Sequence, residues 1–281
     1  MTIASEISRI QGNIADAYDA LEAKGATMPI IENSASLVSA IDTIPENSRY
    51  GCSFNNLLGP VNSSGTYVHD EGPSILSFNS IKYISSSWCL AYKFFNHTNI
   101  EEISFPDLEN VQGLESLSNA FAAPNFSDLS IYKLTTVSFP KLVTVGQQCL
   151  WYTFSYQKSL TTVSFPELTR LVVSQSMGYC FYGCAALTTI VFPKLSDLTT
   201  NSALLDNCFA YSGLQSLSFP ALTSTSFGSS TQQFHNMLRG VTGCTVHFPS
   251  NLQSIISSWT DIVNGFGGTN TTILFDLTAT S

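Results

Sequence analysis

The sequence predicts an α/β solenoid with a parallel sheet along one face. Three observations predict it. A six-residue phrase returns every 26 to 34 residues, a second phrase headed by Cys alternates with it, and 44% of the 281 residues are hydrophobic while 11% are charged. A repeat of this length is typical of a chain that winds one coil per repeat. We therefore expect stacked coils that share one elongated core, because no single coil can bury its apolar side alone.

The first phrase ends a short apolar segment with Phe, usually followed by Pro. It reads ISFPDL from Ile103, VSFPKL from Val137 and VSFPEL from Val163. Residues two apart on a strand point to the same side, and Pro belongs where a strand ends because it cannot donate a ladder hydrogen bond. Each coil should therefore supply one short strand and one buried Phe. The marker residues are Phe78, Phe105, Phe139, Phe165, Phe192, Phe219 and Phe248.

Alternation along each strand turns a row of small hydroxyl residues away from the core. The expected sheet face consists of Ser104, Thr136, Ser138, Thr162, Ser164, Thr189, Ser216 and Ser218. One interpretation makes this face a docking surface for a polymer or a protein. The other is that Ser and Thr simply suit an exposed parallel sheet, and we favour this second interpretation.

The second phrase places a Cys at the start of CLAY, CLWY, CFYG and CFAY. These residues are Cys89, Cys149, Cys180 and Cys208, four of an odd total of seven Cys. A small residue that recurs once per coil can stack on its copies, so we expect a ladder of buried, reduced thiols. Cys180 and Cys184 have a spacing known from zinc sites, but no second ligand pair follows.

Aromatic residues gather beside the Cys phrase. Aromatic rings that keep one face exposed to solvent can stack on sugars or anchor a protein partner. Trp151, Tyr152 and Tyr156 depart most from the repeat pattern and are the preferred candidates for such a role. The expected recognition surface consists of Trp151, Tyr152, Tyr156, Tyr182, Tyr211 and Tyr92.

The chain divides into an N-terminal helical segment at 1–48, the solenoid at 49–249 and a C-terminal cap at 250–281. In the cap, Ser250–Val263 predicts one amphipathic helix and Thr271–Leu277 a final strand. Residues 1–24 predict a helix with a heptad seam, which favours a homo-oligomer, a trimer in particular, or else packs on a second helix at 34–44. The seam consists of Ile3, Ile7, Ile10, Ile14, Ala17 and Leu21.

Two segments carry a family resemblance. CFYGCAALTTIVFPKL from Cys180 and CFAYSGLQSLSFPAL from Cys208 resemble repeats of the BspA-like leucine-rich repeat family. The resemblance implies a leucine-rich-repeat array. It also implies a surface or secreted protein of bacteria, protists or their phages, with a role in adhesion rather than catalysis.

Composition and charge argue against some classes of binding partner. A net charge of −9 argues against nucleic acid, and no apolar run is long enough for membrane insertion. No His, Ser, Cys or carboxylate grouping resembles a catalytic, metal or cofactor site, so we expect no enzyme and no cofactor. Because no secretory signal is visible, the first hypothesis is a protein of the virion. It would lie in a phage tail or other appendage, contact other virion proteins and bind a host cell-surface glycan or protein. A bacterial cell-surface adhesin is the alternative, and a polysaccharide-degrading enzyme is a third.

Overall fold

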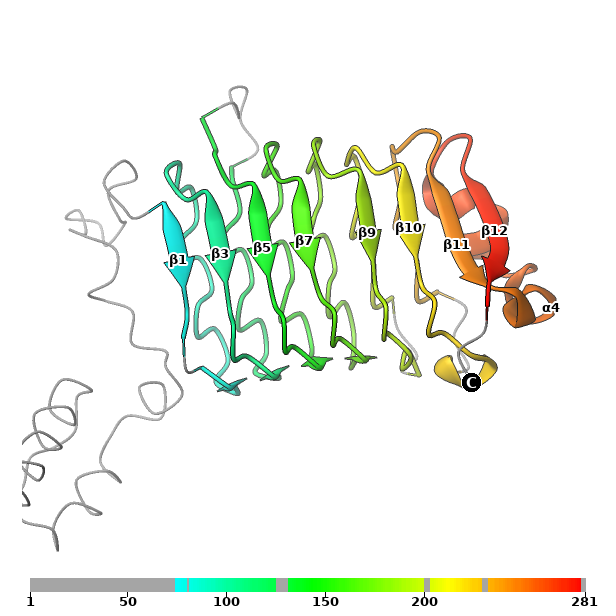
Figure 1. Cartoon of the computed structure of the whole chain (residues 1–281), viewed down its shortest axis with the longest axis horizontal. Helices are drawn as coiled ribbons and strands as arrows, with labels where there is room; N and C mark the ends of the chain where they lie inside the picture. The colour runs from blue at the N-terminus through cyan, green and yellow to red at the C-terminus, as the bar shows by residue number, and fades with distance from the viewer. Residues whose placement is uncertain (1–73, 80, 125–130, 200–202, 229–231, 279–281) are drawn as a thin grey trace, which may run out of the picture. The chain divides into compact units, whose positions relative to one another are not determined.

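The computed structural model describes residues 74–79, 81–124, 131–199, 203–228 and 232–278, all within one compact unit, Leu57–Ser281. In these residues the chain winds into a parallel β-solenoid, whose strands lie side by side in chain order (Figure 1). The predicted segment at 1–48, with its seam, lies outside the described residues, so the trimer stays a prediction. The strands of the main face are β1 (Ile75–Ser77), β3 (Glu102–Ser104), β5 (Thr136–Ser138), β7 (Thr162–Ser164), β9 (Thr189–Val191), β10 (Ser216–Ser218), β11 (Thr245–Pro249) and β12 (Thr272–Leu277).

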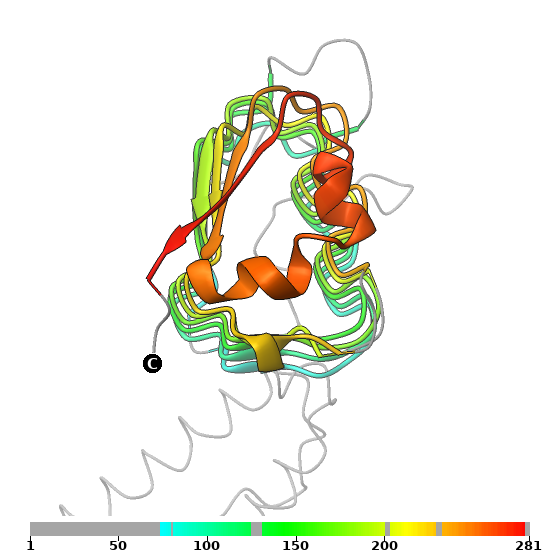
Figure 2. The ribbon, with the colours of Figure 1, turned by 90° about the vertical axis from the view of Figure 1, so that its right-hand side faces the viewer.

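The strands of the main face form two parallel four-stranded sheets, β1-β3-β5-β7 and β9-β10-β11-β12, and each pairs in the register that the repeated phrase predicts. Val137 of β5 lies opposite Val163 of β7, and Ile190 of β9 lies opposite Leu217 of β10. A third, narrower sheet follows the Phe-Pro turns of the first coils. Its strands are β2 (Tyr83–Ile84), β4 (Asn110–Val111), β6 (Thr144–Val145) and β8 (Arg170–Leu171). Viewed along the solenoid, successive coils follow one another around a common outline (Figure 2).

The side of each coil opposite the main sheet consists of turns rather than helices. Among the described residues, α-helix occurs only after β11, at the C-terminal end. Over the described residues the fold is thus a parallel β-solenoid with little helix, and the expected parallel sheet and repeat register are confirmed. The turns do not need helices because their backbone groups bond to the neighbouring coil: the N–H of Phe154 donates to the carbonyl of Cys180 at 3.0 Å.

Two stacks of Phe rings run through the core. The marker Phe residues of the main sheet stack on one another, with 5.1 Å between the ring centroids of Phe139 and Phe165. The rings of Phe94, Phe121, Phe154, Phe181 and Phe209 form a second stack on the turn side. Edge-to-face contacts join the two stacks, as between Phe165 and Phe181 at 6.3 Å. Such offset and edge-on pairs add to the free energy of burial, so these rings hold adjacent coils together.

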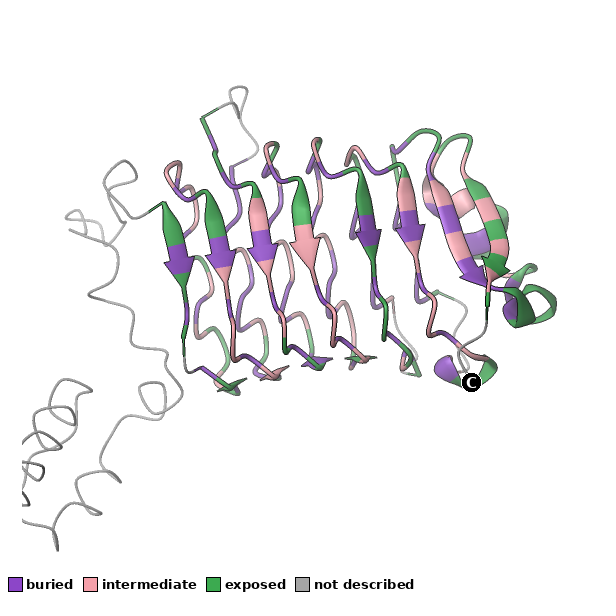
Figure 3. Ribbon diagram, viewed as in Figure 1, coloured by how far each residue is buried: buried purple, intermediate pink, exposed green. Residues whose placement is uncertain are grey.

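Most main strands bury a central residue between more exposed neighbours, as expected of a sheet with one face on the core, whereas β7 and β12 contain no fully buried residue. In β5 the central Val137 is buried while Thr136 and Ser138 are half-buried, and β9 shows the same pattern around Ile190. Figure 3 shows this alternation along the row of strands. The Ser and Thr residues of these strands are more exposed than the residues between them, and the role of the hydroxyl face stays a prediction.

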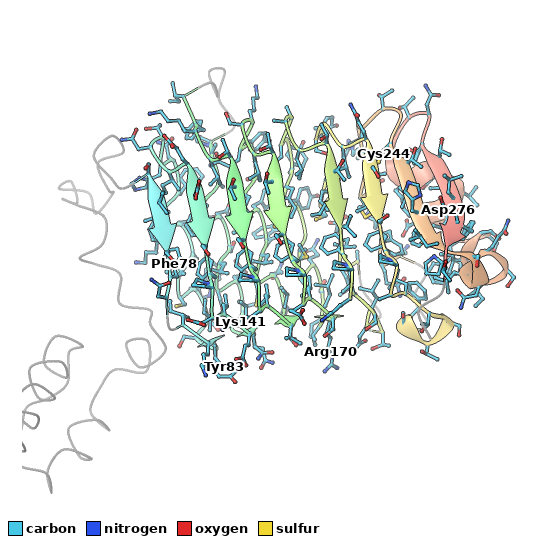
Figure 4. All side chains as sticks on the ribbon, viewed as in Figure 1. Phe78, Tyr83, Lys141, Arg170, Cys244 and Asp276 are labelled. Carbon is cyan, nitrogen blue, oxygen red and sulfur yellow. The ribbon has the colours of Figure 1, made fainter. Side chains whose placement is uncertain are left out.

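A row of charged residues crosses the coils just after the Phe-Pro turns. Lys141 Nζ lies 2.7 Å from Asp107 Oδ1 on the preceding coil, and Lys194 Nζ lies 2.6 Å from Glu167 Oε2. Figure 4 labels Lys141 at this edge of the solenoid. In coil order the row reads Asp107, Lys141, Glu167 and Lys194, so acid and base alternate. Exposed pairs of this kind contribute little to stability individually, but they disfavour a wrong register.

The C-terminal cap differs from the prediction in its helices. Instead of one helix over Ser250–Val263, the chain forms η2 (Ser250–Leu252), α4 (Gln253–Ile256) and α5 (Thr260–Val263). The break falls at Trp259, whose backbone is extended and whose ring packs edge-on against Phe227, 4.9 Å away. These helices lie at the C-terminal end of the solenoid (Figure 2). The expected last strand is present as β12, which brings Phe275 onto the main Phe stack.

The four Cys of the second phrase do not form a single ladder. Cys180 and Cys208 occupy equivalent places, each just before a Phe of the turn-side stack, whereas Cys149 lies five residues before Phe154. The turns repeat at four-residue intervals within a coil, so two inward positions can each accept a small side chain. The expectation that Cys89 is a reduced thiol is also wrong: Cys89 is disulfide-bonded. The residue is half-buried.

The remaining described Cys are free and buried, and we expect them to resist labelling. Burial raises the pKa of the Cys149 thiol to about 12 and that of Cys244 to about 11, and it raises the pKa of Cys180, Cys184 and Cys208 as well. Because the thiolate is the reactive form, little of it is present at pH 8. Intact-mass analysis with a thiol reagent should show slow modification of native protein and rapid modification in denaturant. Rapid labelling of all five in native protein would contradict the buried arrangement.

Candidate recognition surface

The turn side of the solenoid is built from residues with left-handed backbone at every fourth position. In one coil these are Gln148, Tyr152 and Tyr156, with φ of 51°, 54° and 61°. Hydrogen bonds between coils align these positions, because the N–H of Tyr152 donates to the carbonyl of Gly178 just before Tyr179 at 3.0 Å. The left-handed residues therefore form columns along the solenoid. The middle column consists of Tyr92, Asn119, Tyr152, Tyr179, Asn207 and Asn236.

Tyrosine is an unfavourable residue for these positions. Asn and Gly accept positive φ readily, whereas a bulky side chain in this region is an outlier. Asn and Gly do fill many of the equivalent positions, including Asn119, Asn207 and Gly240. The left-handed backbone therefore carries a conformational cost at these tyrosines. Strained positions of this kind concentrate at binding sites.

The structure brings five of the six predicted recognition residues together. Tyr152 packs edge-on against Trp151 at 5.0 Å and lies 6.4 Å from Tyr182, and Tyr182 contacts Tyr156 and Tyr211 at 5.2 Å each. Tyr92 is not among these contacts. It lies two coils away in the middle column, with Asn119 between it and Tyr152.

Tyr179, one of the aromatic residues beside the Cys phrase, joins this group although it is not among the six residues of the expected recognition surface. Its ring stacks on that of Tyr152 at 4.5 Å and lies 5.8 Å from Tyr182, so it belongs to the same group. Its position directly before a Cys phrase was visible, but the alignment of Tyr179 with Tyr152 depends on the offset between the two kinds of Cys phrase. We call the group of Trp151, Tyr152, Tyr156, Tyr179, Tyr182 and Tyr211 the aromatic surface.

The aromatic surface is partly covered by its own rings. Burial is the main cause that raises the pKa of Tyr152, Tyr156 and Tyr179, so their hydroxyls stay protonated at physiological pH. Tyr211, at one end of the group, is 47% exposed. Neutral hydroxyls can both donate and accept hydrogen bonds, and the exposed ring offers an apolar face.

A polar network adjoins the aromatic surface and was not predicted from the sequence. Its centre is Asp206, which is 6% exposed. Asp206 accepts hydrogen bonds from Gln175 at 2.9 Å and Asn207 at 2.8 Å, and its Oδ1 lies 2.8 Å from Nδ1 of His235. Asn207 also donates to the hydroxyl of Tyr179 at 3.2 Å. These residues come from three different coils, so no local sequence pattern joins them.

The network reaches toward the C-terminal cap through Asp261 of α5. Asp261 is 2% exposed, and burial raises its pKa while the nearby His235 opposes that shift. Asp261 therefore lies near enough to His235 for the imidazole to influence its pKa.

The hydroxyl face of the main sheet is chemically more uniform than the aromatic surface. Its rows run in register along β3, β5 and β7, as with Thr136 opposite Thr162 and Ser138 opposite Ser164. Exposed apolar residues interrupt the rows at Ile75 and Val191. This regular array contains less chemical variety than the aromatic surface with its polar network.

Over the described ranges, no group of three or more His, Cys, Asp or Glu residues is placed to hold a metal ion. None of the helices in that part of the chain is long and apolar enough to cross a membrane.

These features define a class of protein: a parallel β-solenoid of short repeats that displays an aromatic surface on its turn side. A family model described as a BspA type leucine rich repeat region, with 6 copies, matches residues 42–200 and 126–259, which is more than half of the chain. The protein belongs to the BspA-type leucine-rich repeat family. Repeats of this kind suggest a surface or recognition protein. Searches of curated proteins and of solved structures returned no match.

Proposed function

We propose that the protein is a non-enzymatic recognition protein that binds a host cell-surface glycan or protein through its aromatic surface. The observation that supports this proposal is the placement of tyrosines at left-handed positions that Asn or Gly occupies in other coils. Left-handed backbone at bulky residues concentrates at binding sites, which supports a role for these tyrosines in recognition. Tyr and Trp are also the residues that most often dominate binding energy, because they contribute large contact area with few rotatable bonds.

The hydroxyl face of the sheet is the second candidate surface. Exposed Ser and Thr exchange hydrogen bonds with water for similar bonds with a ligand, so each contributes little net free energy. The aromatic surface additionally offers apolar rings beside a fixed polar network. These are the two components that small-ligand and carbohydrate sites combine. We therefore assign the main contribution to binding to the aromatic surface.

Two locations for this recognition protein are proposed. The first is a phage tail or other appendage, where the chain would contact other virion proteins and assemble as a trimer through residues 1–24. The second is the bacterial cell surface, where the chain would act as an adhesin. The disulfide at Cys89 favours the second, because disulfides persist in oxidising compartments outside the cytoplasm. The neighbouring genes distinguish the two, since structural genes of a virion lie together.

Replacing both Trp151 and Tyr152 with Ala is expected to weaken binding by about tenfold or more, because truncation removes the aromatic contact area. The measurement is binding of the full chain to an array of host-type glycans and extracellular proteins. Circular dichroism should show the same fold, because both side chains are only half-buried.

The matched control replaces Ser138 and Ser164 with Ala on the sheet face, and we expect unchanged binding. If the Ser138/Ser164 variant loses binding while the Trp151/Tyr152 variant binds fully, the binding site lies on the sheet face and not on the aromatic surface. An array on which nothing binds the wild-type chain would contradict the proposed function itself.

A further inference from the structure

The solenoid ends on a strand whose outer edge is unpaired. Over the described ranges, β12 pairs with β11 alone, and it stands last in the order β9-β10-β11-β12. With six residues, Thr272–Leu277, it is also longer than the other described strands. In the view onto this end, no described segment lies in front of β12 (Figure 2). A long, exposed edge of a sheet is a template for pairing with another strand.

The free edge of β12 carries main-chain groups that can bond to such a strand. The N–H of Thr272 donates to the carbonyl of Cys244 on β11 at 2.9 Å, and the same register continues to Leu274. The register shifts by one residue beyond Leu274, but side chains still alternate between exposed and half-buried to the end of the strand. Main-chain groups of successive residues in a strand point to opposite edges. Those of Ile273 and Phe275 therefore face away from β11.

The inward side chains of β12 are also incompletely covered. Phe248 on β11 is fully buried, whereas Ile273 and Phe275 on β12 are half-buried. At the other end of the described solenoid, the inward residues Leu76 and Phe78 are 3% and 4% exposed. Apolar side chains thus remain to be buried at the C-terminal end and not at the other. This difference favours a symmetric contact between the same ends of two copies over a head-to-tail contact.

The charge on β12 selects a register for pairing with a second copy. Asp276 is the single charged residue of this strand, and its carboxylate lies 2.9 Å from Nδ1 of His247 on β11. A two-fold axis at Leu274 would set each Asp276 opposite the hydroxyl of Thr272 on the other copy, which can donate a hydrogen bond to it. An axis one residue later would set the carboxylate opposite the apolar Leu274. An axis at Asp276 would set two carboxylates opposite each other, which destabilises a pair of strands.

We propose that two copies of this chain join through antiparallel pairing of β12 about a two-fold axis at Leu274. This inference goes beyond the proposed function and does not depend on it. In this register Ile273 of each copy lies opposite Phe275 of the other, and the two exchange main-chain hydrogen bonds. Their side chains form pairs of an aromatic with a β-branched residue, a kind of pair that stabilises antiparallel sheets. The sheet then continues from one copy into the next, and the apolar end of each solenoid is covered.

Single cysteines at two positions of β12 test both the pairing and its register. At the axis, the two copies of residue 274 face each other as a non-hydrogen-bonded pair with Cα atoms about 4.5 Å apart, which a disulfide can span. Full-length Leu274→Cys is therefore expected to form a covalent dimer under mild oxidation with diamide, seen on a non-reducing gel. Thr272→Cys is the matched control and should form little dimer, because each copy faces Asp276 of the other. Wild type, with its native Cys residues, gives the background.

Sedimentation of the full-length protein at micromolar concentration is the second measurement. Leu274→Lys should sediment at half the mass of wild type, because two like charges would meet at the axis. Residues 1–24 are the same in both proteins, so any assembly through them leaves this ratio unchanged. Leu274 is exposed, so circular dichroism should show the same fold in the variant.

Equal masses for wild type and Leu274→Lys would overturn the proposal. So would cross-linking of Leu274→Cys no greater than the wild-type background, or equal cross-linking at positions 272 and 274. If wild type sediments without pairing, and Leu274→Lys instead loses binding to a protein or glycan of the host array, the edge of β12 serves a different partner. The self-association is then wrong, while the proposed recognition function stands.

Discussion

Replacing Phe165 with Ala is expected to lower the free energy of unfolding by about 3–5 kcal/mol. Phe165 is 1% exposed and stacks between Phe139 and Phe192, with an edge contact to Phe181 on the turn side. Truncation would remove the contacts that join three coils and leave a cavity that the stacked backbone cannot close. Chemical denaturation followed by circular dichroism measures the change.

Phe275→Ala provides the comparison for Phe165. Phe275 occupies the same place in the last coil, but it is half-buried and has only Phe248 below it in the stack, at 5.9 Å. We expect a loss of about 1–2 kcal/mol there, since less area is removed from contact. Equal losses at the two positions would show that the Phe stack is not what holds neighbouring coils together.

Gly213→Ala is expected to destabilise the solenoid by about 3 kcal/mol. The added Cβ would lie 2.0 Å from the carbonyl oxygen of Ala185 on the preceding coil, which is backbone and cannot rotate away. The two coils would have to separate, which also strains the hydrogen bond from the N–H of Gly213 to the carbonyl of Cys184. Thermal and denaturant unfolding of the variant give the measurement.

Gly243→Ala is the control for this close approach. A Cβ at Gly243 meets no atom within 4 Å, but the residue has a φ of 76°. The expected cost is about 1 kcal/mol, from the left-handed backbone alone. A larger loss at Gly243 than at Gly213 would mean that backbone conformation, not the spacing of coils, decides which glycines are needed.

The main sheet could be predicted from the sequence because each coil repeats the same inward positions. Val137 and Phe139 recur as Val163 and Phe165, and the structure pairs them in that register. Phe275 was not recognised as a further marker, because its phrase, ILFDL, lacks the Pro that ends the other strands. The expected single helix in the cap failed at Trp259, whose packing on Phe227 is a tertiary contact that periodicity does not contain.

The aromatic surface was predictable in part, and the polar network was not. Trp151 and Tyr152 could be singled out because they differ from the residues at the corresponding positions of other repeats, and this difference is visible in the sequence alone. The contacts of Asp206 with Gln175 and His235 join residues 31 and 29 positions away, on neighbouring coils. The sequence-based prediction also aligned the Cys phrases wrongly. Because the turns repeat every four residues, each coil has more than one inward position, and Cys149 and Cys180 occupy different ones. Only the hydrogen bonds between coils fix which residues lie side by side.

The alternating charges of Asp107, Lys141, Glu167 and Lys194 bear on how such an array can grow. Loss of the coil that carries Lys141 would set Asp107 beside Glu167, and duplication of any one coil would set two like charges together. Gain or loss of two neighbouring coils keeps every acid next to a base. Over this stretch, the chain can therefore change its length at the smallest electrostatic cost in steps of two repeats. The charge pattern thus repeats every two coils, whereas the backbone repeats every coil.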